Sequence, residues 1–252
     1  MPGIHSIPMR AFFLTLFAAM TPLVLLEAAE PSVLVVNKGV GGATTQNGLA
    51  RFERDVNEVR PDHLVLYFGV NDACNQGKWI SVEQYEKNLE TMIDRSPTKS
   101  VILVTPNVVD EDLLKLRHPR HPHKDSLSEH LSKYDAAVRR VAERRRLPLV
   151  DLRALTRETG GASGPDSLVR NRENSRSKDG VHLTAEGYRR FAMLFEPVFE
   201  ERIEPGDVVV CLGDSITYGA HMAGAGTATG ETYPAWLSVT LNRMVGAWDR
   251  TE

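Results

Sequence analysis

Five short apolar segments recur along the chain, and each is rich in β-branched residues. None alternates polar with apolar residues, as a strand with one exposed face would. Strands that are apolar on both faces are typical of parallel sheets covered by helices on both sides. The segments are SVLVV (32–36), HLVLYF (63–68), SVILVT (100–105), LPLVDL (147–152) and DVVVCL (207–212).

Helical patterns occupy the segments between these runs. Ser81 and Gln84 have the spacing of a capping box, and apolar residues with helical spacing follow them. Strand alternating with helix predicts a three-layer, doubly wound α/β sandwich of the flavodoxin-like kind, with a five-stranded parallel sheet. The predicted helices span 81–95, 131–146, 184–201 and 234–245, and the polar, Gly- and Arg-rich stretch 153–181 is predicted to be an irregular loop.

The N-terminus carries an apolar run at 11–26, with Arg10 before it and Ala28 and Ala29 after it. This pattern resembles a secretory signal peptide. As a helix the run would measure about 24 Å, short of a hydrocarbon core of about 30 Å, so we expect no stable membrane span. The alternative is a buried core helix. We predict a signal peptide over 1–29, a single domain over 30–252, and a secreted or periplasmic location.

The charge argues against a nucleic-acid-binding protein, and the cysteine content argues against a disulfide-stabilised one. The net charge is −3 and the pI is about 6.3, which provide no basic field for nucleic acid, so we expect no nucleic-acid partner. There are two cysteines, Cys74 in a predicted loop and Cys211 in a predicted strand. They form no disulfide framework, and we interpret both as free thiols.

Polar residues follow the apolar runs at the places where an open α/β sheet binds its ligands, the carboxyl ends of the strands. Taken alone, each of these groups of polar residues could be an ordinary turn or a solvated pair of side chains. The glycines of 39–42 could also mark a dinucleotide loop, but the G-x-G-x-x-G spacing would need a glycine where Thr44 stands. Together the groups supply a hydroxyl, backbone amides, a carboxamide and a carboxylate-imidazole pair, which is the inventory for acyl transfer through a serine.

The combination resembles the SGNH, or GDSL-type, family of esterases and lipases. The G-x-S-x-G elbow of the α/β-hydrolases is absent, which argues against that other class of serine esterase. The four blocks that carry the resemblance are GDSITYG (213–219), GVGGATT (39–45), GVND (69–72) and DGVHL (179–183).

The order of the blocks departs from the family. Members usually begin with the serine block and end with the aspartate-histidine block, whereas here the serine block comes last. Moving 207–246 to the front would restore the usual order, so the chain resembles a circular permutant. We expect the serine strand to be last in sequence and central in the sheet, with the new termini at the amino edge, away from the site.

The resemblance implies a role for each matching residue. Ser215 is the implied nucleophile, His182 the general base, and Asp179 the group that orients the imidazole. The implied oxyanion hole consists of the amides of Ser215 and Gly42 and the side chain of Asn71.

No metal or cofactor is implied. The histidines at 118, 121 and 123 are separated by prolines, and we interpret them as a solvated loop rather than as a ligand cluster.

The expected partner is a small-molecule or carbohydrate ester, and nothing in the sequence indicates the oligomeric state. We expect a serine esterase acting on short-chain acyl or O-acetyl carbohydrate esters. One alternative is a lysophospholipase or lipase, which would need an apolar acyl tunnel. The other is a non-catalytic, carbohydrate-binding pseudohydrolase, which would need neither Ser215 nor His182.

Overall fold

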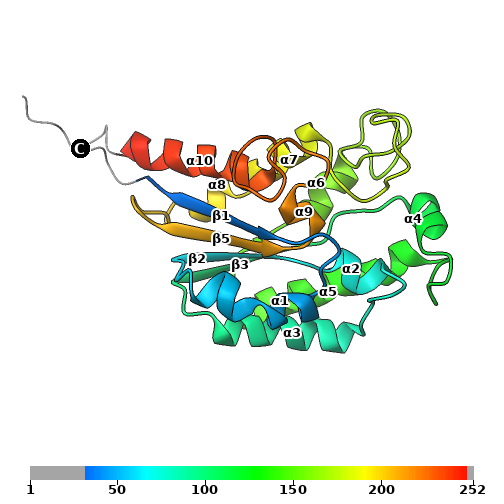
Figure 1. The fold of residues 1–252 in the computed structure, drawn as a ribbon, viewed down its shortest axis with the longest axis horizontal. Coiled ribbons are helices and arrows are strands. Elements are labelled where there is room, and N and C mark those ends of the chain that lie inside the picture. The colour runs from blue at the N-terminus through cyan, green and yellow to red at the C-terminus, as the bar shows by residue number, and fades with distance from the viewer. Residues whose placement is uncertain (1–31, 249–252) are drawn as a thin grey trace, which may run out of the picture.

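The computed structural model describes residues 32–248, and within them five parallel strands form one sheet in the order β1-β5-β2-β3-β4. Helices cover both faces of the sheet (Figure 1). The predicted α/β fold with a five-stranded parallel sheet is confirmed. The strands are β1 (Leu34–Gly39), β2 (His63–Tyr67), β3 (Ser100–Val104), β4 (Leu149–Val150) and β5 (Val208–Gly213).

The two faces of the sheet bury separate cores because successive side chains of a strand point in opposite directions. In β5, Val210 and Leu212 belong to the core beneath α1, α2, α3 and α5, whereas Val209 and Cys211 belong to the core beneath α6 to α10. The helices are α1 (Thr45–Ala50), the π-helical turn η1 (Glu53–Asn57), α2 (Val70–Cys74), α3 (Val82–Arg95), α4 (Glu111–Arg117), α5 (Leu127–Arg145), α6 (Leu152–Glu158), α7 (Ala185–Met193), α8 (Glu196–Phe199), α9 (Ser215–Tyr218) and α10 (Tyr233–Trp248).

The last strand of the chain lies inside the sheet. It pairs in parallel with β1 on one side, where Leu34 faces Val208, and with β2 on the other, where His63 faces Val209. The helix that follows, α10, returns along β1. The side chain of Asn242 bonds both backbone groups of Val33, each at 3.0 Å, so the described C-terminal helix lies beside the first strand (Figure 1).

Several helix boundaries differ from the predictions. Ser81 caps α3 as predicted, but the side chain of Gln84 bonds Asn88, so the capping box is only half formed. The helix predicted at 131–146 starts four residues earlier, at Leu127, and the one predicted over 184–201 is divided into α7 and α8. The stretch 153–181 is not irregular throughout, because Asp151 caps α6 by accepting the Ala154 amide at 2.9 Å.

Both thiols are free, as predicted. Both are also buried, and Cys74 ends α2 instead of lying in a loop. Between residues 32 and 248, no helix combines the length and apolar character needed to cross a bilayer. The apolar run at 11–26 lies outside the described residues.

Candidate active site

Ser215 stands at the turn between β5 and α9. Asp214 caps this short helix, because its Oδ1 accepts the backbone N–H of Ile216 at 2.8 Å. The close packing of α9 on β1 requires a glycine at position 39, since a Cβ there would lie 2.0 Å from the backbone nitrogen of Tyr218. The half-buried Ser215 is thereby held at the carboxyl edge of the sheet, where the sequence predicted it.

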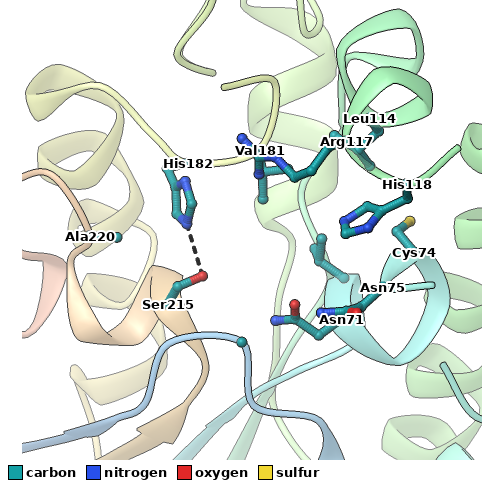
Figure 2. A pocket seen from close by; sticks show the side chains of 12 residues that line it. Asn71, Cys74, Asn75, Leu114, Arg117, His118, Val181, His182, Ser215 and Ala220 are labelled. Carbon is teal, nitrogen blue, oxygen red and sulfur yellow. Dashed lines mark hydrogen bonds between the residues drawn. The ribbon is translucent and has the colours of Figure 1, made fainter. Parts of the chain in front are cut away.

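His182 comes from the segment before α7, and its side chain points directly at Ser215 on the same side of the cavity (Figure 2). Its Nε2 lies 2.9 Å from Ser215 Oγ, and its Nδ1 lies 2.9 Å from both carboxylate oxygens of Asp179. An ionised carboxylate can only accept, so Nδ1 carries the proton and Nε2 is left as an acceptor for the hydroxyl proton. A base and its orienting group are therefore aligned on the hydroxyl.

Asp179 is 2% exposed, and it is held by more than the imidazole. Its Oδ1 accepts the backbone N–H groups of Val181 and His182, each at 3.1 Å. Burial raises the pKa of Asp179, but the hydrogen bonds from His182 and the charge of Arg117 outweigh it and hold the pKa well below its usual range. The carboxylate is thus kept ionised beside the imidazole.

Gly42 and Asn71 line the same cavity as His182. Gly42 adopts φ +69°, a left-handed conformation that favours glycine, and its carbonyl accepts from Lys78 Nζ at 3.0 Å. Asn71 is in the first turn of α2, which follows β2 directly, and its side chain extends toward Ser215 (Figure 2). Its Nδ2 donates to Asp214 Oδ2 at 3.1 Å. One N–H of the carboxamide is engaged by Asp214, and the second is available to a ligand.

The four groups predicted from separate parts of the sequence thus border one cavity of about 330 Å³. Ligand pockets in proteins commonly have volumes of this order or larger. Apolar side chains form part of the wall, and the end of α4 contributes polar ones (Figure 2). The lining residues are Gly42, Val70, Asn71, Cys74, Asn75, Leu114, Arg117, His118, Val181, His182, Ser215 and Ala220.

Two buried carboxyl groups lie behind the serine turn. Burial raises the pKa of Asp72 to about 6 and that of Asp214 to about 7, and Asp72 adds to the rise at Asp214 by charge repulsion. Asp72 Oδ1 accepts the Thr45 amide at 2.8 Å. The sequence assigned no chemistry to either group, and the contact of Asp214 with Asn71 depends on the tertiary fold.

The histidine-rich segment is only partly the solvated loop that the sequence predicted, because one of its three histidines is buried. His121 is 1% exposed and His130 is 7% exposed, and both rings contact Trp79 edge to face. The rings of His123 and His130 stack with centroids 4.0 Å apart. Because α5 starts earlier than predicted, His130 belongs to this helix and lies under the histidine-rich segment. The helix predicted from the sequence, 131–146, did not include His130.

Two further residues near the site escaped sequence reasoning. Arg117, at the end of α4, donates to the backbone carbonyl of Asp179 at 2.9 Å. His221 follows the serine turn, and its Nε2 lies 3.3 Å from Asp179 Oδ2. The sequence signal that could have identified His221 is its position in a Gly-rich loop directly after the serine block.

The chain is similar to known acylhydrolases and esterases. Residues 17–190 match the model of the GDSL-like lipase/acylhydrolase family. An acetylxylan esterase of Geobacillus stearothermophilus is 27% identical over 182 residues, which cover 68% of this chain and 75% of that protein. A lipoprotein of Bacillus subtilis, YqeF, is 26% identical over 180 residues, covering 66% of this chain and 73% of that protein.

Solved structures show the same fold. A lipase/acylhydrolase from Enterococcus faecalis superposes with a TM-score of 0.50 at 27% identity, over 65% of this chain and 74% of that one. An acetyl-xylooligosaccharide esterase from Geobacillus stearothermophilus gives a TM-score of 0.52 at 24% identity, over 64% of this chain and 70% of that one, and this likeness concerns the fold alone.

Proposed function

Because this chain belongs to the GDSL-like lipase/acylhydrolase family and is a carboxylic ester hydrolase, we propose that it works through a Ser215-His182-Asp179 triad. The observation that carries the proposal is the unbroken hydrogen-bonded series from Ser215 Oγ through His182 to Asp179, with 2.9 Å at each step. A nucleophile, a base and an orienting carboxylate in this arrangement are the requirements for covalent acyl transfer.

In the proposed reaction, Ser215 Oγ attacks the ester carbonyl carbon as its proton passes to His182 Nε2. The imidazolium, stabilised by Asp179, then gives this proton to the leaving alcohol, and an acyl-serine remains. Water then attacks the acyl-serine in the same way. His182 takes a proton from the water, and the hydroxide oxygen bonds to the acyl carbon. The proton returns to Ser215 Oγ as the carboxylic acid leaves.

The proposed oxyanion hole consists of the backbone amides of Ser215 and Gly42 and the free N–H of the Asn71 carboxamide. These donors border the same cavity as the hydroxyl. Donors fixed in advance stabilise the charge that develops on the carbonyl oxygen without reorganising during the reaction. No step of this mechanism draws on a metal or a cofactor.

The proposed substrates are small or carbohydrate esters with a short acyl group, most simply O-acetyl groups. The modest volume of the cavity supports a short acyl chain, and the similarity to an acetylxylan esterase supports a carbohydrate alcohol. A lysophospholipase or lipase would require room for a long acyl chain. A carbohydrate-binding protein without activity would not require the aligned hydroxyl and imidazole.

Hydrolysis of p-nitrophenyl acetate by the purified protein tests the proposal, with Ser215→Ala as the nucleophile variant. The exposed Ser163 provides a matched control, since Ser163→Ala removes a hydroxyl that does not line the cavity of the triad. We expect Ser215→Ala to abolish turnover and Ser163→Ala to preserve it. Activity in folded Ser215→Ala equal to that of the wild type would refute the mechanism. A rate that rises from acetyl to decanoyl esters would favour the lipase alternative.

We also propose that residues 1–29 are a signal peptide and that 30–252 form one secreted or periplasmic domain. The lipoprotein relative supports a location outside the cytoplasm. Mass spectrometry of the protein recovered from the extracytoplasmic fraction would locate the mature N-terminus. An intact N-terminus on cytoplasmic protein would contradict this proposal.

Finally, we propose that the order of the blocks is a circular permutation of the family's usual order. The interior position of β5, the contact of α10 with the start of β1, and a family match that ends before Ser215 all support it. A chain that places 207–248 before 32–206, joined by a short Gly-Ser linker, is expected to fold with the same activity. Failure of this rearranged chain to fold would count against the proposal.

A further inference from the structure

A second histidine contacts the carboxylate that orients His182. His221 lies in the Gly-rich loop after α9, and its Nε2 is 3.3 Å from Asp179 Oδ2. The side chain is 52% exposed, so it is accessible from solvent. Its backbone has φ +71°, a left-handed conformation that is uncommon for a residue with a Cβ. The imidazole rings of His182 and His221 lie 5.0 Å apart, with their planes at 77°.

These three side chains lie close enough together to share one transition-metal ion. One ligand atom from each of Asp179, His182 and His221 lies within 4.8 Å of the other two. Asp179 Oδ2 is 2.9 Å from His182 Nδ1 and 3.3 Å from His221 Nε2. Tetrahedral Zn²⁺ has bonds of about 2.0–2.2 Å to nitrogen and oxygen, which places adjacent ligand atoms about 3.3–3.6 Å apart. The 3.3 Å pair has this spacing, and the 2.9 Å pair would lengthen slightly when the ion replaces the proton between its atoms.

We propose that Asp179, His182 and His221 form an inhibitory site for Zn²⁺ or a similar ion. The inhibition rests on the proposed triad, in which Nε2 of His182 must accept the Ser215 proton. An ion on Nδ1 displaces the proton from that nitrogen, and the neutral ring then carries its single proton on Nε2. The ring in this tautomer donates toward Ser215 Oγ and cannot act as its base.

Ligand chemistry and local charge set the expected selectivity. Two imidazoles and one carboxylate suit Zn²⁺, Cu²⁺, Ni²⁺ and Co²⁺, whereas Mg²⁺ and Ca²⁺ prefer sites made of oxygen. Arg117 Nη2 lies 3.5 Å from Asp179 Oδ1, and Arg170 Nε lies 3.6 Å from Oδ2. These two positive charges oppose a cation, so we expect reversible binding that is weaker than at a structural zinc site.

The first experiment measures esterase inhibition by Zn²⁺ and its reversal by EDTA, with each variant compared with its own uninhibited rate. We expect His221→Asn to raise the half-inhibiting Zn²⁺ concentration by at least about tenfold. The matched control is His123→Asn, which removes a histidine from the cluster around Trp79 and should leave the zinc sensitivity as in the wild type. Mg²⁺ and Ca²⁺ should not inhibit.

The second experiment uses Co²⁺ absorption in Ser215→Ala, and it does not depend on catalysis. We expect the visible bands of a low-coordinate Co²⁺ site in Ser215→Ala, and their loss when His221→Asn is added. Bands that persist in the double variant would overturn the site. Zinc sensitivity that disappears in His123→Asn would do the same by placing the ion in the histidine cluster. Co²⁺ binding through His221, together with a folded wild-type protein that has no esterase activity, would refute the triad but not the metal site.

Discussion

Asn71 Nδ2 donates to Asp214 Oδ2 at 3.1 Å, which links the proposed oxyanion donor to a carboxyl group that is 1% exposed. The other oxygen of Asp214 accepts the Ile216 amide. Both carboxyl oxygens are thus acceptors for N–H groups, one on each side of the serine turn. Asp214 therefore fixes the direction of the second N–H of Asn71, the proposed oxyanion donor.

From this contact we expect Asn71→Ala to lower kcat by about 100- to 1,000-fold, the usual loss for one oxyanion donor. Asp214→Asn places an NH₂ group against one of its two donors, and we expect kcat to fall by about 10- to 100-fold, the equivalent of one hydrogen bond to a charged group. KM for p-nitrophenyl acetate should change little in both variants.

The double variant Asn71→Ala, Asp214→Asn distinguishes a role of Asp214 in positioning Asn71 from a general effect of Asp214 on the fold. If Asp214 acts through Asn71, Asp214→Asn should cost little further activity once Asn71 is alanine. The measurement is kcat for the wild type, both single variants and the double variant. Equal losses from Asp214→Asn in the two backgrounds would rule out the positioning role.

Asp179→Asn should disable the base while preserving the local fold. The carboxamide oxygen can still accept the amides of Val181 and His182, but the NH₂ group donates to Nδ1 and favours the ring tautomer with a proton on Nε2. We expect kcat to fall by about 1,000- to 10,000-fold. An unchanged thermal melt serves as the control, and a kcat within tenfold of the wild type would remove Asp179 from the mechanism.

Gly39→Ala should destabilise the protein, because the new Cβ meets backbone atoms of α9 that have no room to move away. We expect a loss of about 1–3 kcal/mol in the free energy of unfolding, measured with urea. Gly41 is the matched control, since a Cβ there meets nothing within 4 Å, and Gly41→Ala should stay within about 0.5 kcal/mol of the wild type. Equal stability of the two variants would show that the close approach is unimportant.

The two buried carboxyl groups, Asp72 and Asp214, should lower the free energy of unfolding as pH rises. The pKa values of Asp72 and Asp214 are raised to about 6 and about 7, above a value of about 3.9 for an unfolded chain. Between about pH 3.9 and about pH 7 the folded state holds more protons than the unfolded state. The stability that these two carboxyl groups contribute is therefore fully present below about pH 3.9 and is lost as pH rises through about 7.

Asp72→Asn tests this pH dependence because it removes one of the two titrations and the repulsion at Asp214. Relative to the wild type, the variant should become more stable from pH 5 to pH 8, so its free energy of unfolding should increase with respect to that of the wild type. Urea unfolding at both pH values measures it. A difference between variant and wild type that is independent of pH would show that Asp72 does not titrate in this range.

The sequence determined the fold class and the position of the reactive groups along the chain. Apolar strands such as 207–212 can only be buried on both faces, and parallel strands align their carboxyl ends, so Ser215, Asn71 and Gly42 were expected at one edge. The spacing of Asp179 and His182 likewise predicted a pair on one loop. These inferences need only local periodicity and the direction of the strands.

The tertiary structure alone decided the contacts between segments that are distant in sequence. The bond from Asn71 to Asp214 joins residues 143 positions apart, and the approach of His221 to Asp179 depends on how the Gly-rich loop folds. The burial of His121 required the early start of α5. No sequence pattern encodes such contacts, because side-chain distances and burial arise only when separate elements pack together.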